Sequence, residues 1–196
     1  MKKKYVAELI SSIFNPVNFF LIMPFLIVYR DTASGMSALK WELFSVIFIF
    51  LACFFIFFEK TRGIFSDWDL SIKEQRYKFY KFLIICAIVY IGTALFFKGI
   101  LFSISLISLG IGVGILVLDF LNKYIKASVH VAVSSAFVIT VSILYGQNFF
   151  ILTFWIVPLL AWSRLFLKKH TKNEIIAGGI LGSLITLSTF FIGKSL

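Results

Sequence analysis

Three side chains near the end of the chain have the types and the spacing that phosphate chemistry requires. Arg164, His170 and Glu174 lie in the short polar stretch 163–174. His170 and Glu174 are four residues apart, so on a helix the carboxylate can accept a hydrogen bond from one imidazole nitrogen. That bond fixes the tautomer and leaves the other nitrogen as a nucleophile or base. Arg164 adds a planar fork that matches phosphate oxygens. The alternative is a solvated interfacial loop with a capping Glu.

A second pair of polar residues opens an earlier apolar segment. Ser128 is expected as the N-cap of this segment, where its hydroxyl or its backbone N–H could bind a phosphate oxygen. His130, about a turn inside the segment, could protonate a leaving alkoxide or phosphate as a general acid. The alternative is a structural histidine bonded between helices. We interpret the two pairs as two halves of one phosphate-handling site at a membrane surface.

The composition indicates which elements must position these residues. The chain has 196 residues, of which 60% are hydrophobic and 14% charged. Soluble chains have about 45–50% and about 25% respectively, so the solvent here must be lipid. Cys53 and Cys86 both lie in apolar segments, which favours free thiols over a disulfide or a metal site. The net charge of +10 occurs without a basic-aromatic nucleic-acid motif, so it indicates anionic headgroups, membrane topology or an anionic substrate.

We expect an all-α, multi-pass transmembrane bundle of six to seven spans. A span needs about 20 apolar residues, or about 17 at the short end, and none of the apolar runs alternates as a strand would. Residues 1–14 are predicted as an interfacial amphipathic helix, with an extension of the first span as the alternative. Residues 15–196 then form a single membrane domain. The expected spans are 15–29, 41–58, 80–97, 99–120, 127–145, 148–161 and 174–192.

The loops between these spans predict the topology. With seven spans, the N-terminus and the polar loops 59–79, 121–126 and 164–173 lie on one side. All of the 19 Lys and Arg residues lie on that side except Arg30, Lys40, Lys98 and Lys194. The positive-inside rule places this side, and with it the active face, in the cytoplasm. We therefore expect an integral multi-pass protein of a prokaryotic cell membrane.

Two stretches contain the Gly-x-x-x-Gly spacing. They are 110–114 and 178–182. Glycines at this spacing let the backbones of two membrane helices approach closely. We interpret both stretches as packing surfaces without a chemical role.

The two polar pairs together resemble motifs of the type 2 phosphatidic acid phosphatase (PAP2) superfamily of membrane lipid phosphatases. That family carries Ser-Arg, five residues, His, three residues and Asp. This chain has Ser163-Arg164, five residues, His170, three residues and Glu174. The family also carries Pro-Ser-Gly-His ahead of a span, where this chain has Ala127-Ser128-Val129-His130. The resemblance covers about residues 66–182.

The resemblance implies a role for each of these residues. His170 attacks phosphorus and forms a phosphohistidine, and Glu174 takes the place of the orienting Asp. His130 protonates the leaving group. Arg164 and Ser128 hold the phosphate oxygens.

The first motif of the family, Lys, six residues, Arg-Pro, is altered in this chain. Asp69 stands at the Lys position and Tyr77 at the Pro position, on either side of Arg76. We carry over Arg76 as a phosphate-binding residue, and also Lys73, which could share one helical face with it. Because Arg164, Arg76 and Lys73 supply the cations, neither a metal nor a cofactor is implied.

The resemblance therefore implies an integral-membrane lipid phosphatase that acts through a phosphohistidine on a lipid phosphate monoester or diphosphate. The substrate classes are phosphatidic acid, phosphatidylglycerol phosphate and polyprenyl diphosphate. The partners are this lipid and anionic lipids but no nucleic acid, and a homo-oligomer is left open. One alternative is a prenyl-transfer enzyme in which Asp67 and Asp69 hold magnesium and a diphosphate. The other is a catalytically inactive PAP2-like protein that binds or transports lipid.

Overall fold

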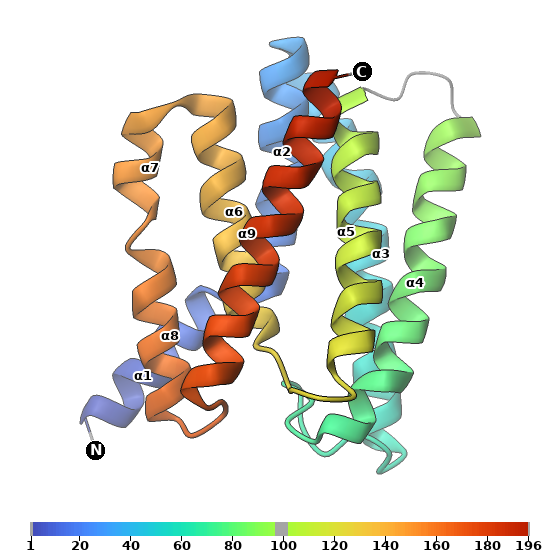
Figure 1. The fold of residues 1–196 in the computed structure, drawn as a ribbon. Coiled ribbons are helices and arrows are strands. Elements are labelled where there is room, and N and C mark those ends of the chain that lie inside the picture. Colours follow the sequence, from blue (N-terminus) through green and yellow to red (C-terminus); the bar gives the residue numbers. More distant parts are fainter. Residues whose placement is uncertain (1, 97–101, 196) are drawn as a thin grey trace. The chain divides into compact units, whose positions relative to one another are not determined.

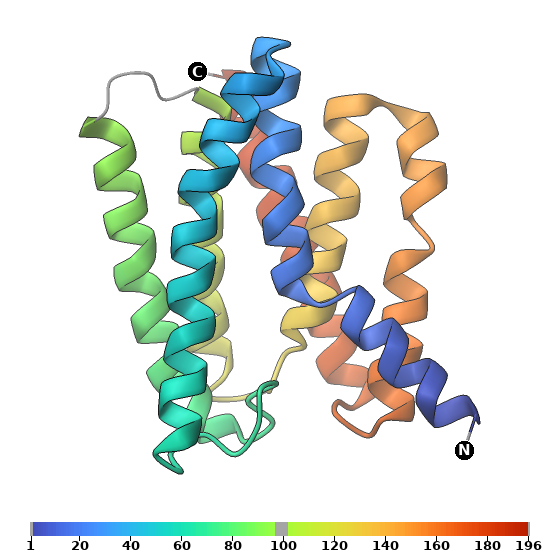
Figure 2. The same cartoon turned by 180° about the vertical axis from the view of Figure 1, so that it is seen from behind.

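The computed structural model describes residues 2–96 and 102–195, and within these ranges it consists of helices and loops without a strand (Figures 1 and 2). The all-α prediction is confirmed for these residues. Lys98 and the adjoining ends of the expected spans 80–97 and 99–120 lie outside the described residues. The helices are α1 (Lys2–Ile13), α2 (Pro16–Thr32), α3 (Gly35–Thr61), α4 (Lys73–Phe96), α5 (Phe102–Leu121), α6 (Val129–Tyr145), α7 (Gln147–Thr153), α8 (Ile156–Phe166) and α9 (Lys172–Ser195).

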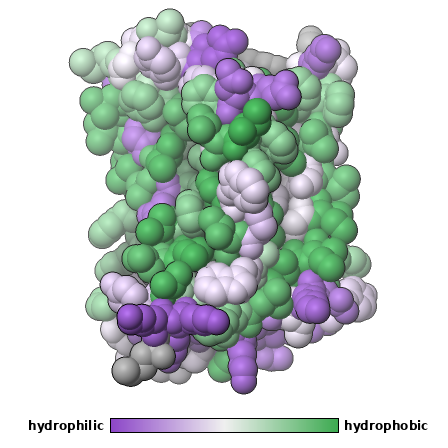
Figure 3. Space-filling model, turned by 90° about the vertical axis from the view of Figure 1, so that its left-hand side faces the viewer, coloured by the Kyte–Doolittle hydropathy of each residue, from purple (hydrophilic) through white to green (hydrophobic). Residues whose placement is uncertain are grey.

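Several of these helices have the length and apolarity of membrane spans. Among the described residues five segments qualify, and α6 is a shorter apolar helix of 17 residues. Figure 3 shows hydrophobic side chains over most of one face. The chain is therefore consistent with an integral membrane protein. The five segments are Lys2–Thr32, Gly35–Thr61, Ser103–Leu121, Gln147–Phe166 and Lys172–Ser195.

The chain divides into two compact units, one formed by residues 1–23 and 125–196 and the other by residues 24–124. In the first unit α6 packs along α9, and α1 packs against α8. In the second unit α5 packs along α4, which also contacts α3. The first unit therefore contains both histidines, and the second contains the altered first motif.

Glycines at the Gly-x-x-x-Gly spacing set the close contact between α6 and α9. A Cβ atom on Gly178 would collide with the carbonyl oxygen of Ser128, and one on Gly182 would collide with that of Ala132. The packing role predicted for the stretch 178–182 is therefore confirmed. Its consequence for function is that the start of α9, next to His170, lies against the start of α6, which carries His130.

Gly182 offers a direct test of this contact. We expect Gly182→Ala to lower the free energy of unfolding by about 1–3 kcal/mol, because the added methyl group overpacks against a backbone that cannot rotate away. Gly112→Ala in α5 is the matched control, since a Cβ atom there meets nothing within 4 Å. Alanine should raise helix stability at that site by up to about 1 kcal/mol. Denaturation of both variants in detergent micelles measures the difference, and equal stabilities would contradict the assigned contact.

The helices extend further into the polar stretches than their apolar cores predicted. The expected loop 59–79 is wrong in its bounds, because α3 continues to Thr61 and α4 already begins at Lys73. The loop expected at 164–173 is shorter as well, since Arg164 lies in the last turn of α8. Charged residues such as Lys, Arg and Glu are good helix formers, so a helix continues where the apolar run ends.

The expected span 148–161 is interrupted in the structure. Helix α7 ends at Thr153 and α8 begins at Ile156, with Phe154 and Trp155 between them. Pro158 explains the break, because it has no N–H to donate to Phe154 and its ring crowds that carbonyl. The carbonyl of Phe154 instead accepts from the N–H of Val157 at 3.3 Å.

Candidate functional site

The predicted contact between His170 and Glu174 is present in the structure. His170 Nδ1 lies 3.0 Å from Glu174 Oε2, and the histidine side chain is only 1% exposed. Because a carboxylate accepts hydrogen bonds, we assign the proton of this bond to Nδ1, and in that tautomer Nε2 carries the lone pair. His170 itself does not lie on a helix, because α9 begins two residues later. The shared helical face expected from the spacing is therefore not the reason for the contact.

A capping box at the start of α9 places the carboxylate instead. Thr171 N–H donates to Glu174 Oε2 at 3.0 Å, and Glu174 N–H approaches Thr171 Oγ1 at 3.4 Å. In a capping box the Thr and the Glu reciprocally satisfy N–H groups that the first helical turn leaves without partners. One carboxylate oxygen thus caps the helix and binds the imidazole. The structure thus contains both contacts expected of Glu174, to the helix start and to His170, and its role in catalysis stays a prediction.

Ser128 connects the start of α6 to the start of α9. It is the N-cap residue of α6 and is fully buried. Its backbone N–H donates to the carbonyl oxygen of Glu174 at 3.0 Å, so the N–H that could have bound phosphate is already used. Its Oγ makes no capping bond and has no hydrogen-bond partner among the described residues. The hydroxyl is therefore the group of Ser128 that can serve a ligand.

His130 follows two residues after Ser128 in the first turn of α6, closer to the helix start than the sequence predicted. It is buried, with 7% of its surface exposed. The contact between α6 and α9 brings the element that carries it against the element that follows His170. The two histidines, forty residues apart in the sequence, therefore lie next to the starts of two helices that pack against each other.

Arg164 is held at the end of α8 by the N-terminal helix. Its side chain is among the most deeply buried of the described residues, and its Nη1 donates to Ser11 Oγ at 2.9 Å. The preceding Ser163 donates its hydroxyl to the carbonyl oxygen of Ala7 at 2.6 Å. Sequence reasoning missed both α1 residues. The sequence signal that could have identified them is a small residue and a polar residue four positions apart, which places Ala7 and Ser11 on one helical face.

Lys126 connects the segment before α6 to the loop that carries His170. Its Nζ donates to the carbonyl oxygen of Lys169 at 3.0 Å. The N–H of Lys169 in turn donates to the carbonyl oxygen of Arg164 at 3.1 Å. The residue that precedes His170 in the loop between α8 and α9 is therefore fixed through both its carbonyl oxygen and its N–H.

The first unit thus contains five of the seven predicted site residues. They supply an oriented imidazole with a basic nitrogen, a second buried imidazole, a guanidinium fork and a buried hydroxyl. These groups can attack phosphorus, donate a proton and bind phosphate oxygens. The five residues are Ser128, His130, Arg164, His170 and Glu174.

The other two predicted site residues, Lys73 and Arg76, lie in the second unit, in the first turn of α4. Arg76 is buried, and its Nε donates to the carbonyl oxygen of Leu70 at 2.9 Å. Lys73 Nζ donates to the carbonyl oxygen of Lys123 at 2.7 Å. Their predicted contribution to phosphate binding stays a prediction from the sequence.

Asp67, one of the two aspartates in the magnesium alternative, has a role within its own loop. Asp67 accepts hydrogen bonds from the N–H of Asp69 at 2.9 Å and from the hydroxyls of Ser66 and Ser71 at 2.9 and 3.1 Å. Such bonds from an Asp side chain to its own loop are typical of turn formation. Within residues 2–96 and 102–195, no group of three or more His, Cys, Asp or Glu residues could hold a metal ion.

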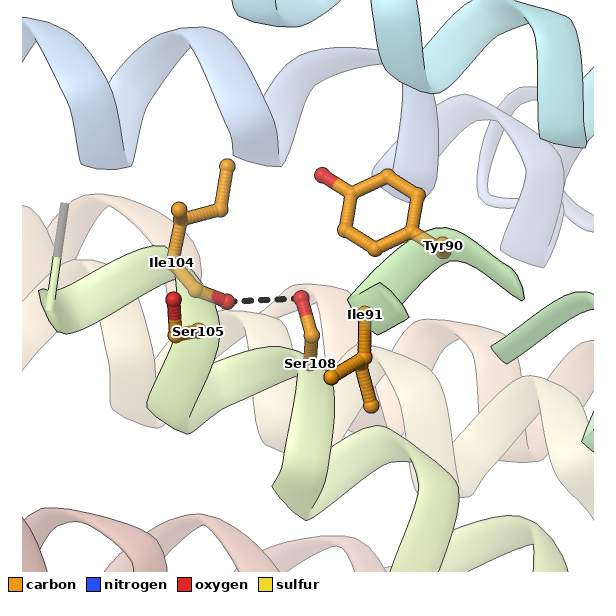
Figure 4. A pocket seen from close by; sticks show the side chains of 5 residues that line it. All are labelled: Tyr90, Ile91, Ile104, Ser105 and Ser108. Carbon is orange, nitrogen blue, oxygen red and sulfur yellow. Dashed lines mark hydrogen bonds between the residues drawn. The ribbon is translucent and has the colours of Figure 1, made fainter. Parts of the chain in front are cut away.

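A small pocket lies elsewhere in the second unit, between α4 and α5 (Figure 4). Its lining is apolar apart from hydroxyl groups, and Ser108 Oγ donates to the carbonyl oxygen of Ile104 at 2.6 Å. Because it carries neither a histidine nor a cation, it offers no phosphate chemistry. The lining residues are Tyr90, Ile91, Ile104, Ser105 and Ser108.

Neither protein-family models, nor curated proteins, nor solved structures provide a match to this chain. Membership in the PAP2 superfamily therefore stays a prediction from the motif resemblance. The geometry described above is the basis for assigning a function.

Proposed function

We propose that the chain is an integral-membrane lipid phosphatase of the PAP2 type that acts through a phosphohistidine on His170. One observation carries the proposal. The buried imidazole of His170 is held at 3.0 Å by Glu174, whose carboxylate is itself fixed by the start of α9. A nucleophile needs a basic atom with a fixed direction, and this bond provides both.

The proposed reaction has two steps. In the first, His170 Nε2 attacks phosphorus, the P–N bond forms, and the ester P–O bond breaks. Protonated His130 gives its proton to the departing lipid oxygen, while Glu174 stabilises the positive charge that develops on the imidazole of His170. In the second, neutral His130 takes a proton from water, the water oxygen attacks phosphorus, and the P–N bond breaks to release inorganic phosphate. Two easier steps replace one difficult displacement.

The phosphate oxygens are bound in the same proposal by Arg164 and Ser128. A guanidinium offers two parallel N–H donors to phosphate, which supplies charge as well as direction. The Ser128 hydroxyl lacks a hydrogen-bond partner among the described residues, so a phosphate oxygen would satisfy a polar group that is otherwise costly to bury. No metal is needed for this charge compensation.

The membrane topology that accompanies this function has seven spans. Helices α2, α3, α4, α5, α6, the pair α7 and α8, and α9 would cross the bilayer, and α1 would lie in the interface. At 17 residues α6 would be about 25 Å long, which lies at the short end of the spanning range. The N-terminus and the loop with His170 then share one side, which the excess of Lys and Arg assigns to the cytoplasm.

The exposed side chains of α1 support its interfacial placement. Helix α1 ends at Ile13 and α2 begins at Pro16, so the two are separate helices. Tyr5, Leu9 and Ile13 are exposed on α1, whereas Ala7 and Ser11 face α8. Apolar side chains on one side of a helix, together with the preceding lysines, suit the boundary between headgroups and acyl chains.

A substrate panel tests the proposed function. Purified protein in detergent micelles is offered phosphatidic acid, phosphatidylglycerol phosphate and undecaprenyl diphosphate, each with and without EDTA. We expect release of inorganic phosphate from at least one of them at a rate that EDTA leaves unchanged. Absence of release from all three would favour an inactive lipid-binding or transport protein. Strict dependence on magnesium would contradict the metal-free mechanism.

A further inference from the structure

The contact between α1 and α8 joins the N-terminal helix to the residue proposed to bind phosphate. Two consecutive residues of α8 each make one hydrogen bond to α1. Ser163 Oγ donates to the carbonyl oxygen of Ala7, and Arg164 Nη1 donates to Ser11 Oγ. Ala7 and Ser11 are four residues apart and both buried, so they form one continuous strip along α1.

We infer that Ser11 is a positioning residue of the phosphate site, which it serves by fixing the guanidinium plane of Arg164. This inference rests on the proposed function. A guanidinium is rigid and planar, so a hydrogen bond to one terminal nitrogen also sets the direction of its other donors. Ser11 would act through Arg164, without contacting the substrate itself.

The arginine needs such support because its stem has several rotatable bonds. A guanidinium that must bind two phosphate oxygens at once contributes much less to the binding free energy if its side chain samples several rotamers. The bond between Ser163 and Ala7 fixes the backbone of α1 one turn before Ser11, so the serine hydroxyl is itself well placed. The N-terminal helix thus becomes part of the site, although it contributes no residue to the three family motifs.

A matched pair of serines in α1 allows a sharp test. Ser11→Ala removes the acceptor for Arg164, whereas Ser12→Ala changes an exposed neighbour. The bond that Ser12 makes to Asn18 uses its backbone carbonyl and survives the substitution. Ser11→Thr retains a hydroxyl at the same place. KM, kcat, the inhibition constant of inorganic phosphate and the melting temperature are measured for each protein.

We expect Ser11→Ala to raise KM and the inhibition constant of phosphate by about tenfold each, because a fork that binds ground state and transition state alike acts mainly on KM. Ser12→Ala should match the wild type, and Ser11→Thr should recover most of the loss. In an Arg164→Lys background, Ser11→Ala should have no further effect on KM, since the group it positions is gone.

The outcomes separate this inference from the proposed function. If the wild type releases phosphate and Ser11→Ala has an unchanged KM, the inference is wrong and the phosphatase assignment survives. A lower melting temperature with unchanged KM would likewise overturn it, because it would reduce Ser11 to a packing role. An additive effect of Ser11→Ala in the Arg164→Lys background would also contradict it. A wild type inactive on every substrate would remove the proposed function itself.

Discussion

Replacing His170 by alanine is expected to lower the rate of phosphate release by at least about 10³-fold, as removal of a covalent nucleophile does elsewhere. In the proposed mechanism, the substitution deletes the nitrogen that forms the bond to phosphorus. Arg164 and Ser128, which we propose to bind the phosphate, remain, so the affinity for the lipid phosphate should change far less than kcat. The chain should still fold, because the capping box at the start of α9 involves Thr171 and Glu174 and does not need the imidazole.

Thr171→Ala is the matched control for this variant. It removes one hydroxyl of the capping box, which typically costs about 0.5–2 kcal/mol of stability, but it leaves the imidazole and the carboxylate in place. We therefore expect a lower melting temperature and a mostly retained kcat, the reverse of the pattern for His170→Ala.

Incubation with a lipid carrying labelled phosphate, followed by an alkaline quench, should trap the label on wild-type His170 only. Full activity of His170→Ala would end the phosphohistidine mechanism.

The sequence was most informative where chemistry depends on local spacing. The contact between His170 and Glu174 was predicted from their separation, and the structure contains it. The reason differed, because the two residues do not share a helical face; Thr171 and Glu174 instead form a capping box at the start of α9. A close helix contact at Gly178 and Gly182 was likewise predicted from the sequence. The sequence did not identify α6 as the partner helix.

Contacts between distant segments could not be predicted from the sequence. The bond from Arg164 to Ser11 joins residues more than 150 positions apart, and it depends on which face of α1 meets α8. The hydrophobic pattern of α1 predicted its apolar face, whereas the contact uses the small and polar strip with Ala7. Helix bounds were also misjudged, because apolar runs end where charged residues begin, while backbone hydrogen bonding continues through them. Lys73 at the start of α4 is the clearest case.

Replacing His130 by alanine is expected to produce a second large loss, and one that depends on the leaving group. For a lipid phosphate the leaving alkoxide is strongly basic and needs a proton as the P–O bond breaks, so we expect a loss of about 10²–10⁴-fold. For p-nitrophenyl phosphate the leaving phenolate is stable without a proton. The first turnover, which forms the phosphohistidine, should then fall by less than about tenfold.

The comparison between the lipid phosphate and p-nitrophenyl phosphate separates two roles of His130. A buried histidine can act as a proton donor, or it can only pack between helices. A histidine that only packs between helices would lower the rates with both substrates equally. Ser134→Ala is the matched control, since Ser134 is buried one turn further along α6 and its hydroxyl donates only to the nearby carbonyl of Val131. Loss of the Ser134 hydroxyl should change the rates with both substrates by the same factor.

In His130→Ala, the second step should remain slow even with p-nitrophenyl phosphate, because water still needs a base. The expected signature is thus a rapid burst of p-nitrophenol followed by slow turnover, and equal losses in both steps for both substrates would show that His130 is not the acid.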